Sequence, residues 1–134
     1  MELTLPMALS ILPHLSARDS SEIRRTQPDL EKWAMGRCML PGMAVAIIAG
    51  GEVQAIGGVV DCNGVGTLWL AGREGWTRYV KHVLRVFREI QLAGFKRMEC
   101  KAYLDNARAQ RFVERLGFAR IGVKGNLVHY GMTP

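Results

Sequence analysis

The sequence predicts an α/β fold in which a mixed sheet of six to seven strands carries helices on both faces. Two apolar runs of strand length flank a Gly-Gly pair, which is typical of a hairpin. A strongly amphipathic helix follows, and strand and helix patterns then alternate to the end. The length of 134 residues, with 49% hydrophobic and 22% charged side chains, suits one domain over residues 1–134.

The first third of the chain is predicted to hold a short strand and two helices. Residues 3–5 are apolar and have the length of a short strand. Asp19-Ser20-Ser21-Glu22 resembles a helix start, because acidic side chains favour the first turn. Pro28-Asp29 begins a second helix from Leu30 to Cys38, which closes before Pro41-Gly42.

Three strands are predicted next. Residues 43–49 are continuously apolar, Gly50-Gly51 favours a tight turn, and residues 52–60 form the returning strand. Asn63-Gly64 makes another turn before a third strand over residues 67–70.

The helix from Arg78 to Ile90 has two chemically different faces. With residues spaced about 100° apart, its apolar side chains fall in one arc of roughly 160°. These are Tyr79, Val80, Val83, Leu84, Val86, Phe87 and Ile90. The opposite face is strongly basic, so one side is expected to pack on a core and the other to face solvent.

The C-terminal part is predicted to run strand, helix, strand, strand. Apolar and polar side chains alternate over residues 97–104, as in a half-buried strand. A helix over residues 107–116 ends at Gly117. Residues 118–123 and 126–130 fit the last two strands.

The charge is distributed unevenly along the chain. Residues 1–66 hold five basic and seven acidic side chains, a net charge of −2. Residues 67–134 hold 13 basic and five acidic side chains, a net charge of +8. An anionic partner is therefore expected at the second half, and nucleic acid, a phosphorylated cofactor and an acidic protein all qualify.

Several protein classes are excluded by composition. The chain has no apolar run that approaches the roughly 18–20 residues of a membrane span, and we identify no signal peptide. Cys38, Cys62 and Cys100 lie far apart, outside any CxxC or Cys/His cluster. Reduced cytoplasmic thiols are the simplest interpretation, and no metal site is expected.

Residues 105–118 resemble the C-terminal signature of the GNAT N-acetyltransferase superfamily. The matching residues are Asn106, Ala109 three positions later, and Leu116-Gly117-Phe118 at the helix end. Gly57-Gly58 in the hairpin and the element order over residues 43–124 also fit. The resemblance implies a mostly antiparallel sheet and acetyl-CoA (or CoA) as cofactor.

In this family two parallel strands splay apart and bind the amide-rich pantetheine arm. The resemblance places these strands at residues 67–70 and 97–104, with a phosphate loop at residues 71–78. A helix N-terminus beside the loop favours the pyrophosphate. The implied cofactor-binding residues are Trp69, Leu70, Ala71, Arg73, Gly75, Trp76, Thr77, Arg78, Asn106, Ala109 and Phe112.

The chain departs from the family at three places. The phosphate loop lacks the Arg/Gln-x-x-Gly-x-Gly/Ala spacing, and Trp76 stands where a small residue is usual. Val113 takes the position of the family's tyrosine acid, and residues 67–70 hold no carboxylate base. Acid–base catalysis typically contributes about 10²–10⁴-fold. Tyr103 is the remaining candidate catalytic donor to the leaving thiolate.

Three functional hypotheses follow. The first is a GNAT-type N-acyltransferase that acetylates a small-molecule or protein amine. The second is a catalytically silent GNAT-fold protein of a bacteriophage, because Trp69-Leu70 before a degenerate loop resembles GNAT-like internal virion or head-associated proteins. Its partners would be phage structural proteins, and its location the virion instead of the cytoplasm.

The third is nucleic-acid binding through the basic helix, which we rank last. A homo-oligomer is compatible with each hypothesis, and no membrane partner is expected.

Overall fold

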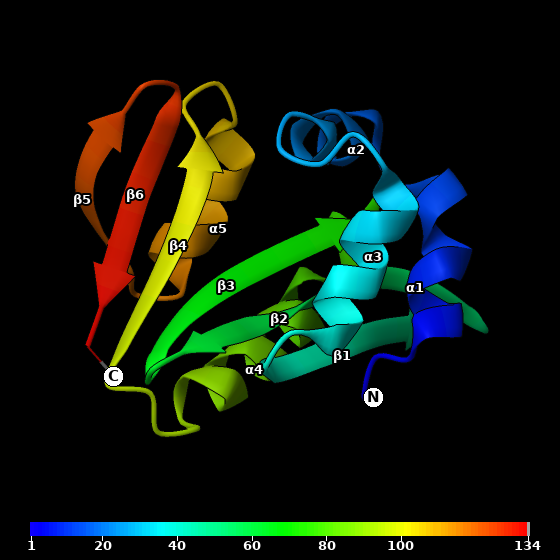
Figure 1. Ribbon diagram of the computed structural model, residues 1–134, viewed down its shortest axis with the longest axis horizontal. Helices are drawn as coiled ribbons and strands as arrows, with labels where there is room; N and C mark the ends of the chain where they lie inside the picture. The colour runs from blue at the N-terminus through cyan, green and yellow to red at the C-terminus, as the bar shows by residue number, and fades with distance from the viewer. Residues whose placement is uncertain (134) are drawn as a thin grey trace.

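A computed structural model describes residues 1–133 and, within them, a six-stranded sheet in the order β1-β2-β3-β4-β6-β5 (Figure 1). Only β3 and β4 pair in parallel among these strands, so the sheet is mixed and mostly antiparallel, as predicted. The strands are β1 (Gly42–Ala49), β2 (Glu52–Cys62), β3 (Val65–Gly72), β4 (Arg97–Tyr103), β5 (Ala119–Lys124) and β6 (Leu127–Met132).

The sheet splits between its two parallel strands. The β3–β4 pairing covers Val65–Thr67 against Arg97–Glu99. Beyond these residues the strands diverge, and Figure 1 shows β3 and β4 running apart toward their C-terminal ends. The edge of β3 from Leu68 onward therefore faces a gap instead of a neighbouring strand.

Helices cover the two faces of the sheet, as predicted. The first face carries α1 (Leu5–Ile11), a 3₁₀ turn (Leu12–His14), α2 (Ala17–Arg24) and α3 (Leu30–Met39). The other carries a second 3₁₀ turn (Trp76–Tyr79), α4 (Val80–Gln91) and α5 (Ala107–Arg115). Each face has its own buried cluster, one centred on Phe87 and Tyr130 and the other on Ile11 and Ile56.

Helix α4 has the predicted two-faced character. Val83, Leu84, Phe87 and Ile90 are each at most 4% exposed. The helix proper begins at Val80, since Gly75 adopts a left-handed φ of 82° and the chain makes a 3₁₀ turn before it. Burying this apolar face is the main stabilising contribution of the helix.

The hairpin glycines allow backbones to approach closely. A Cβ on Gly58 would lie 2.0 Å from the Met43 carbonyl oxygen, and one on Gly57 would lie 2.7 Å from the Phe87 ring. Both positions therefore require glycine, which gives a physical reason for the Gly57-Gly58 pair.

The N-terminal predictions need two corrections. The strand expected at residues 3–5 is wrong: Leu5 begins α1, because the Thr4 side chain caps the helix and Pro6 suits its first turn. The N-terminus touches the sheet through a single bridge of Glu2 to Val45. Helix α2 begins at Ala17, capped by Ser16, so the acidic residues lie inside its first turns.

No helix within residues 1–133 is long and apolar enough to cross a membrane.

Candidate active site

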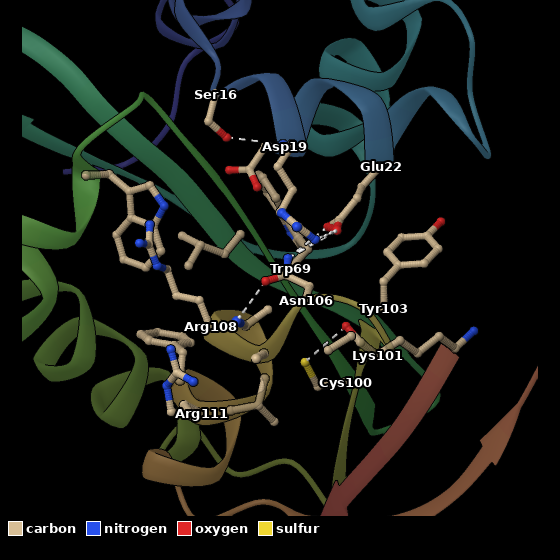
Figure 2. Close-up of a pocket in the computed structure, with 18 of the residues that line it drawn as sticks. Ser16, Asp19, Glu22, Trp69, Cys100, Lys101, Tyr103, Asn106, Arg108 and Arg111 are labelled. Carbon is tan, nitrogen blue, oxygen red and sulfur yellow. Dashed lines mark hydrogen bonds and ion pairs between the residues drawn. The ribbon is translucent and has the colours of Figure 1, made fainter. Parts of the chain in front are cut away.

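A cleft of about 550 Å³ opens where β3 and β4 diverge. Its walls come from the C-terminal parts of both strands, the loop after β3, the inner face of α5 and one face of α2 (Figure 2). The sheet's split therefore creates the cavity, and helices from both faces close it.

The β3 wall contributes Leu68 and Leu70, which pack with the cluster under α4 and α5, and Trp69, which packs with the cluster on the other face. Trp69 also packs edge-on against Trp33 of α3, with ring centroids 5.6 Å apart. Ala71 is 1% exposed and belongs to the cluster under α1 and α3, so it lies outside the cleft lining.

The loop after β3 is a tight turn. The Trp76 N–H donates to the Arg73 carbonyl, and the Arg78 N–H donates to the Gly75 carbonyl. The Arg73 Nε donates to the Val53 carbonyl at 2.7 Å, which anchors this guanidinium to β2. Arg73, Gly75 and Trp76 line the cleft, whereas Thr77 and Arg78 do not.

Aromatic rings form a row along the cleft. Trp76 packs edge-on against Phe112 at 5.8 Å, and Phe112 packs edge-on against Phe87 at 5.9 Å. Trp76 also covers Gly72, where a Cβ would lie 2.5 Å from its ring. This row extends from the loop toward the core.

Asn106 caps α5 and is 7% exposed. Its Oδ1 accepts a hydrogen bond from the Ala109 N–H at 3.1 Å, and its Nδ2 donates to Glu22 Oε2 at 3.1 Å. The Asn-x-x-Ala spacing of the sequence signature is thus the spacing of a helix cap. The cap fixes the amide at the cleft wall.

Two carboxylates of α2 reach the cleft, and sequence reasoning missed both. Asp19 Oδ2 accepts a hydrogen bond from the Gly72 N–H at 2.8 Å, at the end of β3. Glu22 lies beside Asn106, with its side chain 18% exposed. The available signal was their separation of three residues, which places both on one face of a helix.

Both carboxyl groups are partly removed from water. Burial raises the pKa of Asp19, and hydrogen bonds with Gly72 and Ser16 partly oppose this effect. Burial likewise raises the pKa of Glu22, and the hydrogen bond from Asn106 opposes it. A carboxylate with a raised pKa is a stronger proton acceptor than an ordinary one.

Helix α2 joins the two sides of the gap. On the β3 side, the Ser16 N–H donates to the Gly72 carbonyl, and Asp19 accepts a hydrogen bond from the Gly72 N–H. From the same first turn, Arg18 reaches the β4 side, where it donates to the Asp105 carbonyl at 3.2 Å and lies 3.7 Å from the Asp105 carboxylate. The helix therefore closes the open end of the split sheet.

No family model matches the chain, and no match is found among curated proteins. Solved structures do match over nearly its whole length. A GNAT-family acetyltransferase from Staphylococcus aureus Mu50 superposes with a TM-score of 0.77 at 15% identity, covering 99% of this chain and 96% of that one. The chain has the GNAT fold.

Two further matches carry more specific descriptions. The ribosomal-protein-S18-alanine N-acetyltransferase of Escherichia coli gives a TM-score of 0.72 at 16% identity, covering 99% of this chain and 91% of that one. Campylobacter jejuni N-acetyltransferase PseH, solved with acetyl coenzyme A, gives a TM-score of 0.63 at 6% identity, covering 91% of this chain and 94% of that one.

The structure places Tyr103 and Val113 at different parts of this GNAT-fold cleft. Both line it. The Arg25 guanidinium lies 4.3 Å from the centre of the Tyr103 ring, and Figure 2 shows the Tyr103 hydroxyl turned away from Asn106. Val113 is 5% exposed and presents only methyl groups to the cleft.

Nine of the twelve residues predicted for the site line the cleft together. These are Tyr103, Trp69, Leu70, Arg73, Gly75, Trp76, Asn106, Ala109 and Phe112. Their roles stay predictions.

Among residues 1–133, no cluster of three or more His, Cys, Asp or Glu side chains is arranged to hold a metal ion.

Proposed function

We propose that the protein is an acetyl-CoA-dependent N-acyltransferase whose reaction takes place in the cleft between β3 and β4. The observation that carries the proposal is the divergence of these strands after Thr67, which turns the β3 edge from Leu68 toward a cavity of about 550 Å³. A strand edge offers N–H and C=O groups to an extended, amide-containing ligand. The volume lies within the usual range for ligand pockets.

Basic side chains flank the outer part of this cleft. Arg108 and Arg111 of α5 line it, and Figure 2 shows both on the side away from Tyr103. Their guanidinium groups suit phosphate oxygens. They would hold the phosphates of CoA and compensate for a loop whose N–H groups are partly used within its own turn.

The α2 wall supplies the groups for the amine. When bound, acetyl-CoA supplies an activated thioester carbonyl. Glu22 would accept the proton that the attacking amine loses as the C–N bond forms, and Asn106 would orient this carboxylate. Asp19 is held by the Gly72 N–H and would instead fix the end of β3. The thiolate that leaves as the C–S bond breaks would take its proton from solvent.

Titration calorimetry of acetyl-CoA and CoA at low salt tests the proposal. We expect binding with a Kd of roughly micromolar, clearly weakened by Asn106→Ser, because the GNAT resemblance implies that the Asn106 amide also contacts the cofactor. Serine keeps a capping oxygen but removes the amide, so the helix start is preserved. The matched control is Asn126→Ser in the exposed β5–β6 turn, which should bind as the parent does. Absence of CoA binding to the folded parent would overturn the proposal.

The catalytically silent phage protein is the alternative. Val113 in place of the family's tyrosine and the tight turn after β3 favour it. It predicts that no amine is acetylated in multiple turnovers, and co-purification with virion proteins would support it.

A further inference from the structure

The inner end of the cleft is lined by apolar side chains. We call it the inner well and define it by Leu68, Phe87, Cys100, Val113 and Leu116. Each of these side chains is at most 8% exposed, yet each lines the cleft. The cleft therefore reaches from the surface into the core between α5 and β4.

Small side chains create this space. On α5, Val113 and Leu116 follow Asn106 and Ala109 along the inner face at helical spacing. On β4, Cys100 and Ala102 point to the same face because strand side chains alternate. Valine, cysteine and alanine at facing positions leave room that one aromatic residue on α5 would fill.

The wall of the inner well accepts only an uncharged, apolar group. Its sole heteroatom among the side chains that define it is the Cys100 sulfur, which lies 3.9 Å from the Lys101 carbonyl. Burial raises the pKa of this thiol to about 12, so it is neutral near pH 7. A polar group placed there would lose its hydration without a strong partner.

The inner well lies at the end of a path that begins among cationic groups. Arg108 and Arg111 stand at the outer part of the cleft, and the Trp76–Phe112–Phe87 row leads inward from there. A ligand with an anionic head and an apolar end matches this gradient. The carboxylates Asp19 and Glu22 lie on the α2 wall and leave the inner well uncharged.

We infer that the inner well holds the acyl chain of the donor and that the preferred donor carries a linear acyl group longer than acetyl. This inference rests on the proposed function and adds the substrate class. Each methylene that enters the inner well should tighten binding by about fourfold.

The test is a calorimetric series of CoA, acetyl-CoA, butyryl-CoA and hexanoyl-CoA on the folded chain. We expect butyryl-CoA to bind roughly 15-fold more tightly than acetyl-CoA, from its two additional methylenes. Equal affinities for the acetyl, butyryl and hexanoyl compounds would overturn the inference while leaving the proposed function intact. Absence of CoA binding would overturn both.

Val113→Phe provides the second arm, because the ring fills the inner well. It should abolish the increase in affinity with acyl-chain length and leave the Kd for CoA within about twofold of the parent value. Val123→Phe on β5, where the valine is 50% exposed, is the matched control and should retain the gain. Equal weakening of CoA and all acyl-CoAs by Val113→Phe would contradict the assignment. The series on the parent chain decides the question even where this variant does not fold.

Discussion

The two walls of the cleft differ in chemistry and in origin. The α5 wall is basic outside and apolar inside, and it comes from the half of the chain with a net charge of +8. The α2 wall presents Asp19 and Glu22 and comes from the half with a net charge of −2. An anionic donor and an amine acceptor would thus each meet the wall of opposite charge, so the sheet's split separates their binding sites.

Replacing the carboxylate at the α2 wall should have the largest effect. Glu22→Gln removes the proposed proton acceptor, and we expect the rate of transfer to an amine to fall by about 10²-fold or more. CoA affinity should stay within about twofold, since the donor binds the other wall. The measurement is thiol release from the acyl-CoA, with an amine identified in an acceptor screen. Glu114→Gln on the exposed face of α5 is the control.

The pH dependence of this rate follows from the direction of the pKa shift. Glu22 works in its ionised form, so the rate should rise with pH through a pKa above the ordinary 4.5 and then level off. The facing charged groups are Asp19 and Arg18 on α2, Arg25 directly after α2, and Asp105 beside Asn106. A pH-independent rate between pH 4 and 8, or an unchanged rate in Glu22→Gln, would contradict the role of this carboxylate.

Weakening the basic wall should reduce donor affinity more moderately. Arg108→Gln and Arg111→Gln should each weaken CoA binding by roughly tenfold, the scale of one hydrogen bond to a charged group. The salt dependence of binding should fall as well. Arg115→Gln on the same helix lies outside the cleft lining and serves as the control. Equal losses in all three variants would show that only net charge matters.

The same carboxyl groups should affect stability. The folded-state pKa values of Asp19 and Glu22 are raised. These two groups therefore contribute fully to the free energy of unfolding at pH values below their ordinary pKa values. This contribution declines as the pH rises through the raised values. Urea unfolding should therefore show that the free energy of unfolding decreases from about pH 4 to about pH 7 more in the parent than in the double variant Asp19→Asn/Glu22→Gln. An identical pH dependence of the two proteins would contradict the shifts.

The smallest effect is expected where α2 is attached to the α5 side. Arg18 is 51% exposed and forms ion pairs with Asp105 and Glu22 at 3.7 and 3.9 Å. Arg18→Gln should lower the free energy of unfolding by less than about 1 kcal/mol, as is usual for exposed pairs. A thermal or urea unfolding curve measures it, and a loss of several kcal/mol would show that α2 holds the sheet together.

The two walls of the cleft also differ in how much of each can be predicted from the sequence. On α5, Asn106 and Ala109 are three residues apart, and their contact is a local helix cap that spacing alone can indicate. On α2, Glu22 meets Asn106 across 84 positions and Asp19 meets Gly72 across 53. No local pattern encodes such contacts, since they depend on how α2 packs over the split sheet.

The other departures also have local physical reasons. Residues 3–5 have strand-like composition, but the Thr4 cap and Pro6 favour a helix start there. After β3, the left-handed Gly75 and the Trp76 ring over Gly72 make a compact turn in place of an open loop. Composition predicted the elements, and side-chain capping decided where they begin.

The central claim is that the gap between β3 and β4 is the donor site, and NMR of the ¹⁵N-labelled chain titrated with acetyl-CoA tests it most directly. We predict that the largest amide shifts occur at Leu68–Leu70 on β3 and at Asn106, Ala109 and Phe112 on α5. The amides of β5 should remain unchanged. Shifts confined to the exposed basic face of α4, or the absence of any shift, would contradict the account.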